Sequence, residues 1–227
     1  MQHRHYIFID PTDTGADIHA HKTLNEIKTI HAKYYVNREV IRYHSYNDIS
    51  KLLESFDIEL QDLFLQLNPR YPALLAAIGR LVILYYYGGI YHDLKCVSTQ
   101  ALDEYLNTSN MDLICEEHPT DKHRVRNTNI VALKTHNPFL ATVLRKIKAK
   151  LLVSKDAFGP DQMFSIDSVI FISEFAHNKC NTIIKHPFIS TNMIIFDNEI
   201  YKKRITRWQR THESIFKPLI AAHITNH

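Results

Sequence analysis

YYYGGIYHDLKC, residues 85–96, joins an apolar run to two adjacent glycines and a carboxylate, in a chain with only 5 glycines among 227 residues. The preceding run PALLAAIGRLVILYYY, residues 72–87, predicts a helix that starts at a proline, and Gly88 suits the residue that ends a helix. GIYHD is aromatic and β-branched, which predicts a short strand with Asp93 at its carboxyl end. Ligands of open α/β sheets bind at that edge, so Asp93 is the first candidate site residue.

The segments around this stretch alternate between strand and helix patterns. HKTLNEIKTIHAKY, residues 21–34, places apolar side chains three or four apart, as one face of a helix does. DISKLLESF, with Asn47 as its N-cap, and IELQDLFLQL predict two further helices. PFLATVLRKIKAKLL predicts a late amphipathic helix, and strands are expected in HYIFID, EVIRYHS, MDLICEE, NIVALK, TIIKHPFIS and NMIIFD. This alternation predicts one mixed α/β domain over residues 1–227, with no linker.

Composition limits the class of protein. Hydrophobic residues make up 45% of the chain and charged residues 22%, which suits a globular domain with a sizeable core. The three cysteines, Cys96, Cys115 and Cys180, have no C-x-x-C spacing, so we expect a reducing, cytoplasmic setting and no structural zinc. The amino terminus lacks a secretory leader pattern. Gly88 and Gly89 interrupt the apolar stretch 73–91, so no membrane span is expected there.

The basic charge is concentrated at the carboxyl end. Residues 201–227 contain six Lys or Arg side chains and one Glu, together with Trp208 and several aliphatic residues. Two interpretations stay open for this basic amphipathic segment. It either contacts an anionic membrane surface or a lipid-linked acceptor, at the inner face of the membrane, or forms a solvated helix whose apolar face lies on the core. A nucleic-acid-binding role has little support, because no recognition motif accompanies the basic residues.

The spacing R-x-x-x-L-Y-x-x-G-G-x-Y-x-D, from Arg80 to Asp93, resembles the sugar-binding glycosyltransferases with an Asp-x-Asp motif, the family 32 group that includes capsular polysaccharide and mannosyl transferases. VIRYHSYND, NTNIVALKTHNPFL and FGPDQMF extend the resemblance over about residues 5 to 165. The resemblance implies a GT-A fold, a single nucleotide-sugar-binding α/β domain with a mixed, mostly parallel sheet flanked by helices. It also implies a retaining hexosyltransferase that uses a nucleotide sugar, with a UDP-sugar favoured and a GDP-sugar as the alternative.

The resemblance and the side-chain chemistry assign provisional roles within this stretch. Asp93 is expected to accept hydrogen bonds from a ribose or sugar hydroxyl, and to be the remaining metal ligand. Arg80 lies on an otherwise apolar helix, so it needs an anionic partner, which either the donor diphosphate or a neighbouring carboxylate supplies. Gly88 and Gly89 let the backbone turn and approach a ligand closely, and Tyr91 lies beside them.

Two positions depart from the family pattern. Ala77 stands three residues before Arg80, where the family has an aspartate, and Lys95 replaces the second carboxylate of Asp-x-Asp. That carboxylate is the one expected to hold Mn²⁺ or Mg²⁺, so the metal requirement is open. A carboxylate and a divalent cation together carry a net charge of +1, which is also the charge of the Lys95 ammonium group. Lys95 is therefore our candidate for neutralising the diphosphate directly. Alternatively, Asp197 or His212 holds a metal.

Further candidates lie downstream. Asn127 and Asn129 precede a predicted strand and either bind donor or acceptor hydroxyls or serve as turn formers. Gly159, in FGPDQMF, belongs either to a loop that faces the acceptor or to a plain turn. Pairs among the 15 histidines lack the H-x-x-x-H spacing of a zinc site. Trp208 and His212 correspond only loosely to late family positions near the donor phosphates.

Taken together, these patterns predict a glycosyltransferase that moves a sugar from a nucleotide donor to a saccharide hydroxyl, in capsule or other surface polysaccharide synthesis. The alternative is a non-catalytic nucleotide-sugar-binding or scaffold subunit of a polysaccharide synthase, in which Ala77 and Lys95 reflect lost activity. Binding without turnover distinguishes the second from the first.

Overall fold

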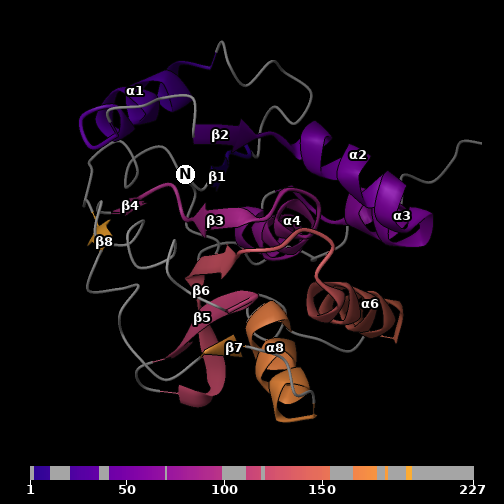
Figure 1. Ribbon diagram of the computed structural model, residues 1–227. Coiled ribbons are helices and arrows are strands. Elements are labelled where there is room, and N and C mark those ends of the chain that lie inside the picture. The colour runs from indigo at the N-terminus through magenta and orange to yellow at the C-terminus, as the bar shows by residue number, and fades with distance from the viewer. Residues whose placement is uncertain are drawn as a thin grey trace, which may run out of the picture.

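The structure is a computed structural model that describes residues 3–10, 21–35, 41–69, 71–98, 111–118, 121–153, 166–177, 182–183 and 193–195. Its strands are β1 Arg4–Ile7, β2 Ile41–His44, β3 Gly89–His92, β4 Cys96–Ser98, β5 Leu113–His118, β6 Asp121–Ala132, β7 Thr182–Ile183 and β8 Met193–Ile195. Six of them form a sheet in the order β2-β1-β3-β6-β5-β7, and β4 pairs with β8 (Figure 1). Three of the five pairings in the large sheet are parallel, so the predicted mixed, mostly parallel sheet is confirmed.

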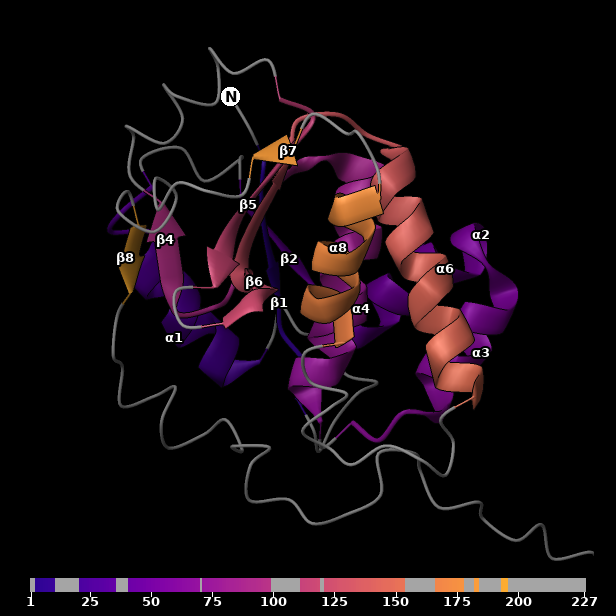
Figure 2. The same cartoon turned by 90° about the horizontal axis from the view of Figure 1, so that it is seen from below.

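Helices cover both faces of this sheet. They are α1 Lys22–His31, α2 Tyr46–Phe56, α3 Ile58–Gln66, α4 Pro72–Tyr87, α6 Pro138–Val153 and α8 Ile166–His177. Helix α1 and the small β4-β8 sheet lie on one side, and the other five helices lie on the opposite side (Figure 2). The largest apolar cluster lies between the sheet and those five helices. Helix α4 is buried almost all round because it packs on β1, β3 and β6 as well as on α2 and α6.

The double glycine ends α4 and starts β3. Gly88 has φ +62°, and its amide donates to the Leu84 carbonyl at 2.9 Å, which confirms it as the residue that closes the helix. Gly89 has φ +86°, and a Cβ there would lie 2.4 Å from the carbonyl oxygen of His3. The close approach at Gly89 is therefore to the backbone carbonyl of His3, the residue before β1, which is why only glycine fits at residue 89.

Several predicted elements differ in detail from those observed. The N-cap of α2 is Ser45 and not Asn47, because Ser45 and Asp48 form a reciprocal capping box. Strand β6 begins well before the predicted NIVALK, and the described parts of β7 and β8 are shorter than predicted. Helix α8 was not predicted, because IDSVIFISEFAH is rich in β-branched and aromatic residues that favour strands, and packing on α6 and β6 overrides that preference.

None of the helices in the described part of the chain combines the length and the apolar character needed to cross a membrane. Residues 73–91 are divided between α4, which ends at Tyr87, and β3, which begins at Gly89.

Candidate donor site

The order of the strands places Asp93 at the switch point of the sheet. Strand β1 lies between β2 and β3 and is parallel to both, so the chain moves to one side of β1 first and to the other side later. The carboxyl ends of β1 and β3 are therefore neighbours at one edge, and this is where open α/β sheets bind ligands. Asp10 follows β1 by three residues, and Asp93 follows β3 directly.

Asp93 is held by both its backbone and its side chain. Its amide donates to the Thr128 carbonyl on β6 at 2.9 Å, and the Tyr91 hydroxyl donates to its Oδ1 at 3.0 Å. The Cys96 amide donates to the Asp93 carbonyl at 2.8 Å, which closes a four-residue turn, Asp93–Cys96. Asp93 and Lys95 are half-buried in this turn. The described residues provide no ion-pair partner for Lys95, so its ammonium group remains available to an anion.

Arg80 is almost completely buried, with 4% of its surface exposed. Its Nε lies 3.4 Å from Oδ2 of Asp167 on α8 and donates to the Ala76 carbonyl, and its guanidinium lies over the Tyr91 ring at 4.9 Å. Burial opposes the charge of Arg80, but Tyr91, Asp167 and Asp93 outweigh burial, so the pKa of the guanidinium is raised. Of the two partners considered for Arg80, the neighbouring carboxylate is present. A contact of Arg80 with the donor stays a prediction.

Tyr91 connects these groups. Its ring is buried against Arg80, and its hydroxyl holds the Asp93 carboxylate, so the side chains of Arg80, Tyr91 and Asp93 form one chain of contacts. Asn129 lies opposite His92 on β6, and its Oδ1 is 2.6 Å from His92 Nδ1. The side-chain amide of Asn129 is thus engaged within the protein and buried, next to Asp93 in the sheet.

Gly88 and Gly89 are not brought together with Asp93. They lie at the amino end of β3 and Asp93 lies beyond its carboxyl end, which separates them by about 13 Å at the rise of a strand. Their observed role is the turn into β3. Gly159, the side chain of Asn127, Asp197, Trp208, His212 and the basic amphipathic segment fall outside the described residues, so these predictions stay predictions.

Two carboxylates near the site were not singled out from the sequence. Asp10 ends the predicted strand HYIFID just as Asp93 ends GIYHD, and this shared position is the signal that identifies it. Asp10 Oδ2 lies 2.8 Å from Nε2 of His21, whose Nδ1 accepts the Thr23 amide at the start of α1. Because Nδ1 of His21 accepts a hydrogen bond, the ring proton is on Nε2, and Nε2 donates to Asp10. Asp167 had no such signal, because α8 itself was not predicted.

Burial lowers the pKa of His3 and, by more, that of four buried histidines. Burial is the main cause in each case, and it lowers the pKa of His31 and His44 to about 4, that of His92 to about 3 and that of His5 to about 2. His5 Nδ1 lies 2.9 Å from His44 Nε2, and two like charges at that distance would repel each other. All four are neutral near pH 7, and no group of three or more potential metal ligands exists among the described residues.

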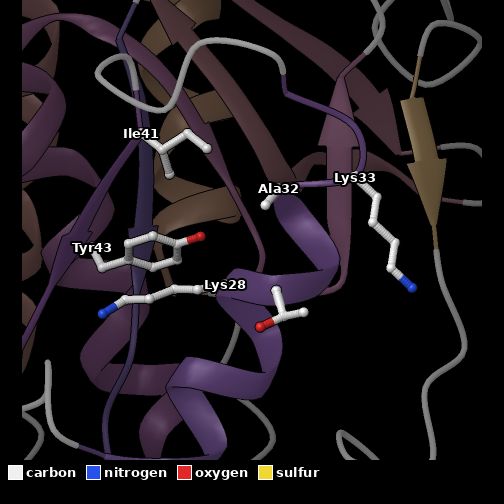
Figure 3. Close-up of a pocket in the computed structure, with 6 residues that line it drawn as sticks. Lys28, Ala32, Lys33, Ile41 and Tyr43 are labelled. Atoms are coloured by element: carbon white, nitrogen blue, oxygen red, sulfur yellow. The ribbon is translucent and has the colours of Figure 1, made fainter.

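Two surface cavities border the edge strand β2. One, of 460 Å³, lies between α1 and β2, where Lys28, Thr29, Ala32, Lys33, Ile41 and Tyr43 line it (Figure 3). The other, of 580 Å³, lies on the opposite face of β2 and is lined by Arg42, Lys51 and Tyr87 among others. Neither of these two cavities includes Asp93 or Lys95, so the candidate donor site at the carboxyl edge is separate from them.

Comparison with solved structures supports the fold. The structure described as "PaToxG Glycosyltransferase" superposes with a TM-score of 0.51 and 16% sequence identity, over 78% of this chain and 69% of that one. At this identity the likeness establishes the fold, which is that of a glycosyltransferase domain and agrees with the predicted GT-A-like architecture. No curated protein matches the chain at the level of sequence.

The amino-terminal half matches a family of known description. Residues 2–112 match the model of the "Glycosyltransferase sugar-binding region containing DXD motif". This match confirms the resemblance to the Asp-x-Asp sugar-binding glycosyltransferases, and it includes β1, β2, β3 and the Asp93–Cys96 turn. Residues 2–112 are therefore similar to a glycosyltransferase sugar-binding region, and the sequence at the expected Asp-x-Asp position is Asp93-Leu94-Lys95.

Proposed function

We propose that this protein is a glycosyltransferase that transfers a sugar from a nucleoside diphosphate sugar to a saccharide hydroxyl. The observation that carries the proposal is the position of Asp93 and Lys95, in a turn at the switch point of a glycosyltransferase fold. Asp93 is oriented by Tyr91 and accepts hydrogen bonds from hydroxyls of the ribose or the sugar. The resemblance to family 32 supports a retaining hexosyl transfer in surface polysaccharide synthesis, on a cytoplasmic donor, with a UDP-sugar favoured over a GDP-sugar.

The Asp93–Cys96 turn suits a diphosphate that is neutralised by an ammonium group. A contact of about 4 Å between Lys95 and one phosphate charge is worth roughly 4 kcal/mol at an effective dielectric constant near 20, before desolvation. We therefore propose that donor binding depends weakly on Mn²⁺ or Mg²⁺, with Lys95 in place of the second carboxylate. As the leaving nucleoside diphosphate gains charge, the same ammonium group stabilises it.

A donor panel tests this function. Melting temperatures are measured with UDP, GDP, CMP and their common sugars, each with Mn²⁺ and with a chelator, because ligand binding to the folded state raises the melting temperature. We expect one nucleoside diphosphate to stabilise the protein in the chelator too. Transfer from the selected sugar donor to saccharide acceptors is then followed by mass spectrometry. If no nucleotide or nucleotide sugar in the panel raises the melting temperature, the proposal is contradicted.

A non-catalytic nucleotide-sugar-binding subunit is the second candidate. It is favoured by Ala77, which is completely buried on α4 where the family has an aspartate, so that no carboxylate is present one turn before Arg80. This candidate would be selected if a nucleotide sugar stabilises the protein but is neither transferred nor hydrolysed over a long incubation. Introducing the missing carboxylate with Ala77→Asp would then restore hydrolysis only if Ala77 is the cause.

A further inference from the structure

The Asp93–Cys96 turn is attached to a side chain from another part of the chain. His31, the last residue of α1, is completely buried and its ring lies between the turn and strand β2. His31 Nε2 is 2.8 Å from the carbonyl oxygen of Leu94, and His31 Nδ1 is 2.7 Å from the hydroxyl of Tyr43. Leu94 is the residue between Asp93 and Lys95, so this contact acts at the centre of the turn.

Protonation fixes the direction of both hydrogen bonds. A carbonyl oxygen only accepts, so Nε2 of His31 carries the proton and donates to Leu94. Burial lowers the pKa of His31 to about 4, so the ring is neutral near pH 7 and Nδ1 accepts. Burial also raises the pKa of Tyr43 far above its usual range, so its hydroxyl keeps its proton and donates to Nδ1. The proton positions are therefore ordered from Tyr43 through His31 to Leu94.

Packing also holds these side chains in position. The rings of His31 and Tyr43 stack at 5.8 Å with an interplanar angle of 12°, and the ring of Tyr6 on β1 lies 4.3 Å from that of His31. The Leu94 side chain packs with Phe8, Leu24 and Ile27 beneath α1. The turn is thus attached to α1, to β1 and to the edge strand β2 at the same time.

We propose that His31 is a positioning residue of the donor site, which acts through its hydrogen bonds to Leu94 and Tyr43 to fix the turn that presents Asp93 and Lys95. This inference rests on the proposed function, since it assigns the turn to donor binding. His31 does not touch the donor. Its neutral tautomer, with the proton on Nε2 and with Nδ1 accepting from Tyr43, holds the Leu94 carbonyl, and the two flanking side chains are thereby directed to the carboxyl edge of the sheet.

The first test is independent of any ligand. Hydrogen exchange is measured for the Cys96 amide, which closes the turn, and for the Ile90 amide, which bonds to His3 in the sheet. In His31→Leu the Cys96 amide is expected to exchange about tenfold faster or more, as for the loss of one buried hydrogen bond, while Ile90 is unchanged. His31→Gln keeps an amide donor near the place of Nε2 and is expected to restore most of the protection.

The second test measures affinity for UDP, or for GDP if the donor panel selects it, by calorimetry at pH 7.5. His31→Leu is expected to weaken binding about tenfold, His31→Gln to recover it, and Tyr43→Phe to have an intermediate effect. The matched control is His44→Leu, which also removes a buried histidine but contacts His5 and Tyr87 and not the turn. It should lower stability and leave affinity unchanged.

The outcomes separate this inference from the proposed function. If the wild-type protein binds no nucleotide, the proposed function is wrong and so is the role of His31 in donor binding. Hydrogen exchange still decides in that case whether His31 holds the turn. Normal binding with unchanged Cys96 exchange in His31→Leu overturns the inference alone. An equal loss of affinity in His44→Leu also overturns it, because the effect would then be one of general stability.

Discussion

Acidification from pH 7 to pH 5.5 is expected to destabilise the protein strongly, through the four buried histidines. The pKa of an unfolded histidine is about 6.5, and the folded-state values of His5, His31, His44 and His92 are about 4 or lower. A lowered folded-state pKa means that the stabilisation is fully present above about pH 6.5. It is lost as the pH falls toward the folded-state values, because the unfolded chain binds protons that the folded chain cannot.

The magnitude follows from proton linkage. Between pH 7 and 5.5 an unfolded histidine gains about 1.2 kcal/mol from protonation, so four that stay neutral in the folded state lower the free energy of unfolding by about 4 to 5 kcal/mol. That loss is a large part of the stability of an ordinary domain, about 5 to 15 kcal/mol. Carboxylates contribute little here, because their usual pKa values lie near 4.

Urea unfolding followed by far-UV circular dichroism, at half-unit steps from pH 7.5 to 5.5, gives the free energy of unfolding at each pH. The slope near pH 5.5 is expected to correspond to the uptake of three to four protons, as the four histidines predict. His136→Asn is the control, since His136 is exposed and its φ of 54° suits asparagine. Its slope should equal that of the wild type. A total loss below about 1 kcal/mol in the wild-type protein would refute the reasoning.

Two further predictions concern stability and are measured by the same unfolding assay. Arg80→Met or Asp167→Leu should each cost about 3 to 5 kcal/mol, because each leaves a buried charged group without its ion-pair partner, and the double variant Arg80→Met, Asp167→Leu should cost less than the sum. Additive costs would mean that the pair is not coupled. Gly89→Ala should cost more than about 3 kcal/mol, because its Cβ would meet the His3 carbonyl oxygen at 2.4 Å in a left-handed conformation. Gly79→Ala should cost less, because its nearest contact is the end of the Ile49 side chain; the reverse order would contradict this account.

Much of the fold could be predicted from the sequence, because local patterns determine it. The helix face of residues 21–34, the proline and glycine that bound α4, and the short strand before Asp93 all follow from periodicity and backbone preference. These signals were enough to predict Asp93 at the carboxyl end of a strand, and the observed strand order puts that end at the switch point of the sheet. Their limit is seen in α8, whose β-branched sequence favours a strand until packing on the sheet is considered.

The candidate site was predictable only where one residue carries its own signal. Asp93 and Lys95 stand in a motif, whereas the partner of Arg80 lies 87 positions later in the chain, on the helix that was not predicted. The role of His31 depends on tertiary contacts to Leu94 and Tyr43, which no spacing in the sequence indicates. The two glycines show the opposite case: the backbone requirement was right, but the closest neighbours are the protein's own carbonyl groups, at His3 and Ala132, and not a ligand.

The most direct measurement of the central claim is the affinity of UDP, or of the nucleoside diphosphate that the donor panel selects, in a chelator and in Mn²⁺. It is made by calorimetry for the wild-type protein and for Lys95→Asp. We expect the wild-type protein to bind the nucleotide in the chelator. In the chelator the affinity of Lys95→Asp should be lower by about 100-fold or more, and Mn²⁺ should restore it, because two carboxylates can then hold the metal. Equal affinity and equal metal dependence in the two proteins would contradict the claim that Lys95 replaces the metal.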